Sequence, residues 1–230
     1  MNATKRALIV RGGWEGHQPV AATDLFIPFL ESSGYHVQIE DKPAVYADED
    51  TMSSIDLVLQ CVTMASIERD EVQGLRKAVA AGTGLAGWHG GIADSYRGSA
   101  DYVQLVGGLF ACHPGKEPES RVGGETDNFI PHRIDILATE HPVTTGLKSF
   151  DLVTEQYWVM TDSYNQVLAT TTVAAQSWNE WSSPITSPAV WTRQWGAGRV
   201  FVATPGHSPD VLRTPQVKTI VERGMQWASR

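Results

Sequence analysis

Three histidines stand close to glycines just after apolar runs of the sequence, and imidazoles are well suited to chemistry near neutral pH. In chain order they are His17 after residues 7–10, His89 after residues 85–88 and His207 after residues 199–203. Histidine titrates between about pH 5 and 8 and can transfer protons, and its neutral form binds zinc and similar metals. The three positions therefore predict either a divalent metal centre or a metal-free site of proton transfer.

The segment around His89 forms the sharpest of the expected turns. It reads Leu85-Ala-Gly-Trp-His89-Gly-Gly91, a short apolar strand that runs into two glycines. Glycine adopts backbone angles that strain other residues, so the chain can bend abruptly here from strand to helix. In nucleophile-elbow enzymes the tip of such a bend carries the nucleophile. We therefore expect the His89 imidazole at the tip.

These histidines require a scaffold that brings strand ends together. The apolar runs 7–10 and 57–62 are typical of strands buried on both faces of a parallel sheet. Residues 20–33 and 68–81 have helical spacing, and Pro28 predicts a kink or a late start in the first of them. This alternation predicts an α/β, flavodoxin-like, three-layer fold with a mostly parallel central sheet. Ligands bind at the carboxyl ends of such strands, where the histidines are expected to converge.

The rest of the chain completes a single predicted domain over residues 1–230. With 42% hydrophobic and 19% charged residues, the chain can bury one large core. Residues 155–158 are aromatic and irregular. We expect helices over 100–110 and 215–230, strands over 35–39, 131–137 and 167–173, a hairpin joining 188–191 to 199–203, and loops over 46–50, 111–115 and 116–128.

Composition narrows the classes of partner. The formal net charge is -8 and no basic run is present, which argues against a nucleic acid or an anionic membrane surface. No apolar run approaches the roughly 18 residues of a membrane span, and we expect a cytoplasmic protein. Cys61 and Cys112 form neither a metal-binding spacing nor a disulfide framework. A small polar ligand is the expected partner, no nucleotide cofactor is expected, and the aromatic content is compatible with a homo-oligomer.

Several ordered motifs resemble the ThuA-like (trehalose-utilisation) family over nearly the whole chain. They are Gly16-His17-Gln-Pro19, Gly87-Trp-His89-Gly90, Gly107-Gly-Leu-Phe-Ala-Cys-His113-Pro114, His141-Pro-Val-Thr-Thr-Gly146, Glu155-Gln-Tyr157, and Trp191 through Arg199 to Gly206-His207. The resemblance implies the flavodoxin-like fold of class I glutamine amidotransferases. His89 then stands where those enzymes carry the cysteine nucleophile, and His207 stands where they carry their histidine. Because the thioester route needs a thiol, glutamine amidotransferase activity is not implied.

The candidate site combines the histidine pattern with this resemblance. As catalytic residues we expect His89, His207 and Glu155, where Glu155 depends mainly on the resemblance and acts as a metal ligand or a base. The expected metal ligands are His17, His89 and His207, and zinc or a similar divalent ion is the expected cofactor. The expected substrate-binding residues are Trp14, Trp88, His113 and Tyr157, whose rings suit a carbohydrate.

Two hypotheses about function stay open at this point. In the first, the protein is a carbohydrate-related enzyme of trehalose or keto-sugar utilisation, acting by hydrolysis, elimination or isomerisation at the histidine cluster. In the second, it is a non-catalytic module that binds a sugar or a protein on an amidotransferase-like scaffold. Fold alone does not separate them, because one fold hosts many functions. Ionisable groups that face one another would favour the enzyme, and scattered histidines would favour the module.

Overall fold

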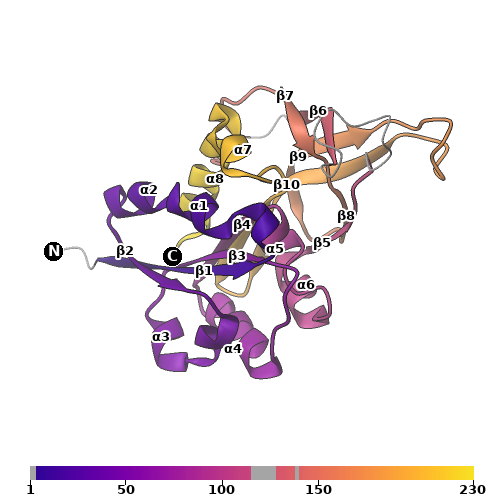
Figure 1. Cartoon of the computed structure of the whole chain (residues 1–230). Coiled ribbons are helices and arrows are strands. Elements are labelled where there is room, and N and C mark those ends of the chain that lie inside the picture. Colours follow the sequence, from indigo (N-terminus) through magenta and orange to yellow (C-terminus); the bar gives the residue numbers. More distant parts are fainter. Residues whose placement is uncertain (1–3, 115–127, 138–139) are drawn as a thin grey trace.

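The computed structural model describes residues 4–114, 128–137 and 140–230, and these form a mixed α/β structure around one large sheet (Figure 1). Within the described residues, nine strands pair in the order β2-β1-β3-β4-β11-β10-β9-β6-β7. Their bounds are β1 Lys5–Gly13, β2 Tyr35–Glu40, β3 Leu57–Thr63, β4 Gly84–Trp88, β6 Phe129–Ile136, β7 Phe150–Glu155, β9 Gln166–Val173, β10 Ile185–Trp195 and β11 Gly198–Ala203. A separate antiparallel pair joins β5 (Gly108–Cys112) to β8 (Trp158–Thr161).

The sheet has a parallel half and an antiparallel half. Strands β2, β1, β3, β4 and β11 are mutually parallel, whereas β10, β9, β6 and β7 extend the sheet with antiparallel pairs. The expectation of a mostly parallel sheet is therefore confirmed for one half only. It was wrong for the other half, whose strands pair antiparallel. The physical reason is connection length, since parallel neighbours need a long crossover, whereas β10 turns directly into β11 through a hairpin.

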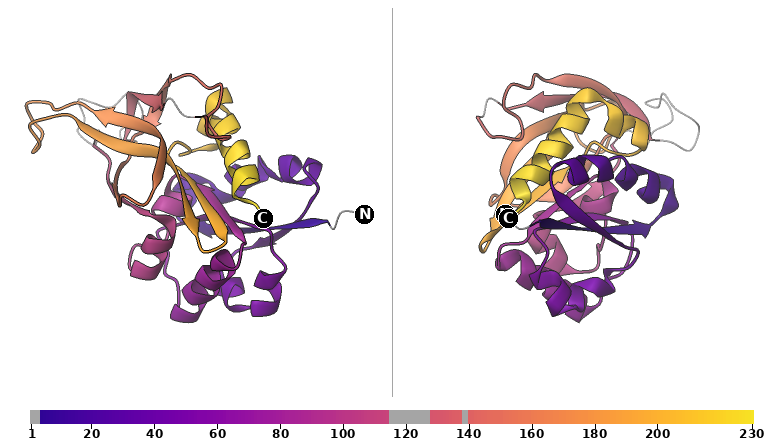
Figure 2. Two further views of the ribbon diagram at one scale, coloured as in Figure 1. Left: turned by 180° about the vertical axis from the view of Figure 1, so that it is seen from behind. Right: turned by 90° about the vertical axis from the view of Figure 1, so that its left-hand side faces the viewer.

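Helices cover both faces of the parallel half, which lies between them in both views of Figure 2. Their bounds are α1 Pro19–Asp24, α2 Ile27–Ser32, α3 Glu49–Ser53, α4 Arg69–Ala80, α5 Gly90–Ala93, α6 Ala100–Val106, α7 Pro209–Arg213 and α8 Pro215–Ala228, with short 3-10 turns η1 Glu15–His17 and η2 Pro43–Ala47. Along β1, Ala7 and Ile9 join one hydrophobic core while Leu8 and Val10 join the other. This alternation explains why the strand reads as a continuous apolar run. None of the described helices has the length and apolar character needed to cross a bilayer.

The expected helices 68–81 and 20–33 are both present, the first as a single helix and the second in two pieces. Helix α4 lies within the expected range 68–81, and Glu68 begins it with a capping box to Glu71. The expected helix 20–33 is divided into α1 and α2, with Pro28 in the first turn of α2. Proline lacks the backbone donor that a helix interior requires, so it is tolerated only near a helix start. The expected interruption at Pro28 is therefore confirmed.

Two other expectations were wrong. The helix expected over 100–110 ends at Val106, because Gly107 adopts a φ of 76° and directs the chain into β5. Residues 46–50 are not a plain loop, since the Asp48 side chain accepts hydrogen bonds from the backbone of Asp50 and Thr51 and begins α3. The loop expected over 116–128 lies almost wholly outside the described residues.

Candidate functional site

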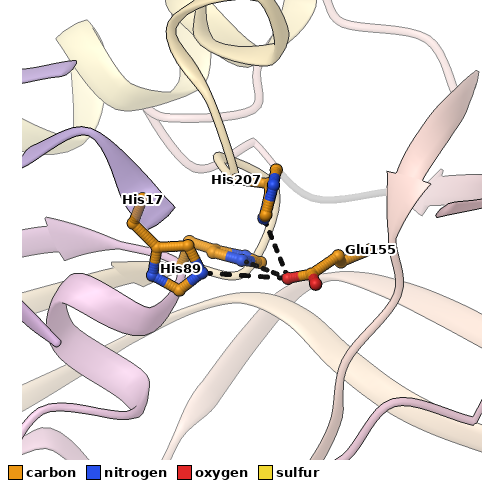
Figure 3. A group of neighbouring side chains, drawn as sticks. All are labelled: His17, His89, Glu155 and His207. Carbon is orange, nitrogen blue, oxygen red and sulfur yellow. Dashed lines mark hydrogen bonds and ion pairs between the residues drawn. The ribbon is translucent and has the colours of Figure 1, made fainter. Parts of the chain in front are cut away.

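Four side chains from distant parts of the chain converge at one edge of the sheet (Figure 3). His17, His89, Glu155 and His207 each offer a ligand atom, and these atoms all lie within 4.8 Å of one another. The histidines follow the parallel strands β1, β4 and β11, whose carboxyl ends meet at this edge. Glu155 is the last residue of β7, so the antiparallel half supplies the carboxylate. We call these four residues the His-Glu cluster.

The backbone at His89 forms a strained bend between β4 and α5. Its φ is 50° and its ψ is -142°, a conformation that residues other than glycine rarely adopt. The bend is held by the His89 backbone N–H, which donates to the Ala203 carbonyl at 2.7 Å. A Cβ atom on Gly90 would lie 2.5 Å from Cε1 of His17, so only glycine allows the two histidine segments to approach this closely. The bend places a histidine that is 1% exposed at the centre of the site.

The hydrogen bonds of His89 fix the position of its proton. Nδ1 lies 2.8 Å from the Thr204 carbonyl oxygen, which can only accept, so the ring proton is on Nδ1. In the neutral imidazole Nε2 then carries a lone pair, and it lies 3.0 Å from Oε2 of Glu155. A carboxylate oxygen also accepts, so two acceptors face each other. A proton or a cation is needed between them.

The other imidazoles surround the same carboxylate. His207 Nδ1 lies 2.9 Å from Oε2 of Glu155, and His17 Nε2 lies 3.8 Å from it. The Nδ1 atom of His17 is held 3.0 Å from the Thr63 hydroxyl, which orients its ring. On the other side, His113 Nε2 lies 3.6 Å from Oε1 of Glu155. Glu155 is therefore the centre of the cluster and contacts every histidine in it.

Burial and the local charges set the protonation states. Burial lowers the pKa of His89 to about 3, although Glu155 acts in the opposite direction. Burial raises the pKa of Glu155, but the imidazoles of His17, His207 and His89 outweigh this and hold it below its usual range. Burial also lowers the pKa of His113. At neutral pH His89 is therefore neutral and Glu155 is ionised, which are the forms that bind a metal ion.

A cavity of about 400 Å³ borders the cluster. Its lining combines aromatic or apolar side chains with polar ones, namely Trp14, Met64, Phe110 and Tyr157 with Arg97, Asp94, Asn128 and His113. Trp14 is 47% exposed and places a flat ring at the cavity. Arg97 is paired with the buried carboxylate of Asp94, with Nη2 2.7 Å from Oδ2, so its charge is compensated. The volume and the mixed lining suit a small polar ligand.

The structure places most of the expected substrate-binding residues at this cavity. The cavity is lined by Trp14, His113 and Tyr157. Glu155, which the family resemblance indicated, lines it as well. Trp88 requires a correction, because it is 2% exposed and its ring packs against Phe26 at 5.0 Å. The bend at His89 turns this ring into the core, so the structure leaves no face of it for a carbohydrate.

Sequence reasoning missed three polar residues of the cavity lining. Asp94 and Arg97 lie just beyond the glycine turn, three residues apart on the short segment after α5, and Asn128 directly precedes β6. Asp94 and Arg97 could have been suspected as an ion pair from the sequence, because opposite charges three residues apart often meet on a helical turn. Asn128 carries no signal that a single sequence shows.

The fold and the cluster together define a mixed α/β protein whose candidate site lies at the carboxyl edge of parallel strands, with three imidazoles around one carboxylate. A family model described as ThuA, trehalose utilisation, matches residues 6–228. The chain belongs to this ThuA family. No curated protein matches the chain.

Solved structures show the same fold at low sequence identity. A ThuA-like protein from Bacteroides uniformis has a TM-score of 0.74 and 18% identity, and the match covers 99% of this chain and 93% of that one. A ThuA-like protein from Parabacteroides merdae has a TM-score of 0.71 and 15% identity, with 98% and 90% covered. A protein from Salmonella typhimurium, described as cytoplasmic, has a TM-score of 0.62 and 14% identity, with 98% and 100% covered.

Proposed function

We propose that this ThuA-family protein is a divalent-metal-dependent enzyme acting on a carbohydrate, of the keto-sugar or disaccharide class, by hydrolysis, elimination or isomerisation. The observation that carries the proposal is the contact between His89 Nε2 and Glu155 Oε2, two acceptors 3.0 Å apart. A bound cation satisfies both atoms, and the neighbouring imidazoles complete its coordination. The family description, trehalose utilisation, supports the class of substrate.

The distances from Glu155 to the three imidazoles support a four-coordinate metal ion, although the four donor atoms, which lie within 4.8 Å of one another, must draw closer around it. Zinc lies about 2.0–2.1 Å from nitrogen and oxygen ligands in a tetrahedral site, which separates neighbouring ligand atoms by about 3.3 Å. The contacts of Glu155 with His207, His89 and His17 measure 2.9, 3.0 and 3.8 Å. The Nδ1–H of His89 also donates to the Thr204 backbone carbonyl, the outer contact that usually orients a ligating imidazole. Three nitrogens and one oxygen suit zinc or a similar ion.

The residues at the cavity can support chemistry on a sugar. A divalent cation would supply Lewis acidity, and if its coordination expands to five it could take up a water and lower the pKa of that water to about 7. His113, neutral because burial lowers its pKa, lines the cavity and can accept a proton from the substrate. Trp14 offers an exposed ring on which a sugar can stack. Glu155 holds the imidazoles of the cluster in place.

The alternative, a non-catalytic module that binds a sugar or a protein, has less support. Such a module has no need of a buried carboxylate surrounded by imidazoles, because burying these groups costs free energy unless they are paired or bind a metal. Perturbed ionisable groups that face one another in a cavity favour an enzyme. We therefore retain the enzyme as the proposal.

Two further assignments belong to the proposal. The order β2-β1-β3-β4-β11 of the parallel half supports a flavodoxin-like fold, whose ligand site lies where the strand order reverses next to β1. The Salmonella structure described as cytoplasmic supports a cytoplasmic location. A carbohydrate as the ligand, the absence of a nucleotide cofactor and a homo-oligomeric state stay predictions.

Turnover by the zinc-loaded protein tests the proposal. Wild type, His207→Ala and His36→Ala would be incubated with trehalose and with keto derivatives of glucose and trehalose, and the products identified by NMR. We expect turnover by wild type and by His36→Ala, which alters an exposed residue of β2. We expect none by His207→Ala, with a melting temperature within a few degrees of wild type. Full activity in His207→Ala would contradict the mechanism, and no turnover by wild type would contradict the enzyme.

A further inference from the structure

We infer that the Tyr157 hydroxyl donates a hydrogen bond to an oxygen of the bound carbohydrate and so fixes that oxygen beside the His-Glu cluster. Tyr157 lies between β7 and β8, two residues after Glu155, and it lines the cavity together with Glu155 and His207. The inference rests on the carbohydrate named in the proposed function, but it does not depend on the metal.

The ring of Tyr157 is already in contact with other rings. Its centroid lies 4.1 Å from that of His89, with an angle of 31° between the two planes. The rings of Phe110 and His113 lie 4.5 and 5.2 Å away. The side chain is only 2% exposed. Tyr157 therefore does not serve as the stacking platform that the sequence predicted, and its hydroxyl is the group that remains for a ligand.

Within the described residues that hydroxyl makes no hydrogen bond, and its oxygen is not sealed off from the cavity that the residue lines. Other buried tyrosines are satisfied inside the protein, since Tyr46 bonds to Gln60 and Tyr102 donates to the Ile92 carbonyl at 3.1 Å. Tyr96 also lacks a partner, but its oxygen is sealed in the core, whereas Tyr157 borders the cavity. Because the Tyr157 hydroxyl is unpaired within the described residues and opens to the cavity, it is available to donate to an oxygen of a ligand bound there.

The position of the hydroxyl indicates what it recognises. A neutral phenol donates well to hydroxyl and carbonyl oxygens, which a sugar or a keto-sugar presents. The neighbouring cation, Arg97, is paired with Asp94, with Nη2 2.7 Å from Oδ2, so the Asp94 carboxylate balances its charge. The Tyr157 hydroxyl would therefore favour substrates with an oxygen at the contacted carbon over deoxy analogues, because a site built to bond a hydroxyl discriminates strongly against a substrate that lacks it.

A pair of matched substitutions tests the inference. Tyr157→Phe removes an unpaired hydroxyl, whereas Tyr102→Phe removes one that is bonded within the protein. Binding of trehalose and of glucose to the zinc-loaded proteins would be measured by calorimetry, together with the melting temperatures. We expect Tyr157→Phe to bind the sugar about 2- to 10-fold more weakly and to melt at or above the wild-type temperature. We expect Tyr102→Phe to melt lower and to bind the sugar as wild type does.

The outcomes separate this inference from the proposed function. Equal sugar affinity in wild type and Tyr157→Phe would overturn the inference, and a drop in melting temperature as large as that of Tyr102→Phe would assign the hydroxyl to the fold. If zinc does not bind but Tyr157→Phe still weakens sugar binding, the metal proposal fails and the inference stands. If zinc binds the wild type but neither sugar does, the result would contradict a carbohydrate ligand, both in the proposed function and in the inference about Tyr157.

Discussion

At the scale of single residues, the site depends on a surplus of hydrogen-bond acceptors around Glu155. His89 Nε2 and the carboxylate can share a contact at 3.0 Å only with a proton or a cation between them. The three strand-end histidines could be predicted from the sequence, because glycine turns after apolar runs mark strand ends. Glu155 could not be predicted from the sequence pattern, since it ends an antiparallel strand in a segment without clear periodicity. Only the family resemblance indicated it.

Glu155→Gln tests this surplus of acceptors. The amide can donate a hydrogen bond to His89 Nε2, so the metal-free variant should be at least as stable as wild type, while its zinc affinity falls by more than about 10-fold. Chemical denaturation of the metal-free proteins and zinc titration by calorimetry would measure both effects. A metal-free variant that is clearly less stable, or one that binds zinc as tightly as wild type, would argue against this view of the cluster.

At the scale of the elements, the strand-to-helix bend between β4 and α5 positions the site. The sequence predicted this bend from its glycines, and the positive φ of His89 agrees with that prediction. In the antiparallel half the sequence predicted the strands over 131–137 and 167–173 and the β10–β11 hairpin, but it did not predict β7 or the pairing of β6 with β7. Strands β6 and β7 have partly exposed residues and no continuous apolar run, so their pairing depends on tertiary contacts.

Gly90→Ala tests whether the strand-to-helix bend must lie close to the His17 ring, which belongs to η1. The new Cβ would lie 2.5 Å from Cε1 of His17, so the His17 ring must move away from Glu155. We expect a loss of about 1–3 kcal/mol in the free energy of unfolding and weaker zinc binding. Gly98→Ala is the matched control, since no atom lies within 4 Å of its added Cβ. Identical zinc affinity and stability in the two variants would show that the bend does not position His17.

At the scale of the whole molecule, buried histidines link folding to pH. Burial lowers the pKa of His89, His113, His132 and His141 below the usual histidine value. The unfolded chain therefore binds more protons than the folded protein below about pH 6.5, and acid favours unfolding. The stabilisation is complete above that pH and is lost progressively as the pH falls.

The expected result is a metal-free protein that is less stable at a pH of about 5.5 than at about 7.5. Each additional proton bound by the unfolded chain contributes a slope of about 1.4 kcal/mol per pH unit. Urea denaturation at the two pH values would measure the change in the free energy of unfolding. Equal stability, or greater stability at the lower pH, would contradict the assignment of neutral buried histidines.

Zinc content measures the central claim most directly. Purified wild type, His89→Ala and His36→Ala would be incubated with zinc, freed of excess ion and examined by elemental analysis. We predict about one zinc per chain in wild type and in His36→Ala, and a loss of bound zinc in His89→Ala. Wild-type protein that retains no zinc, or His89→Ala that retains as much as wild type, would contradict a metal site at the His-Glu cluster.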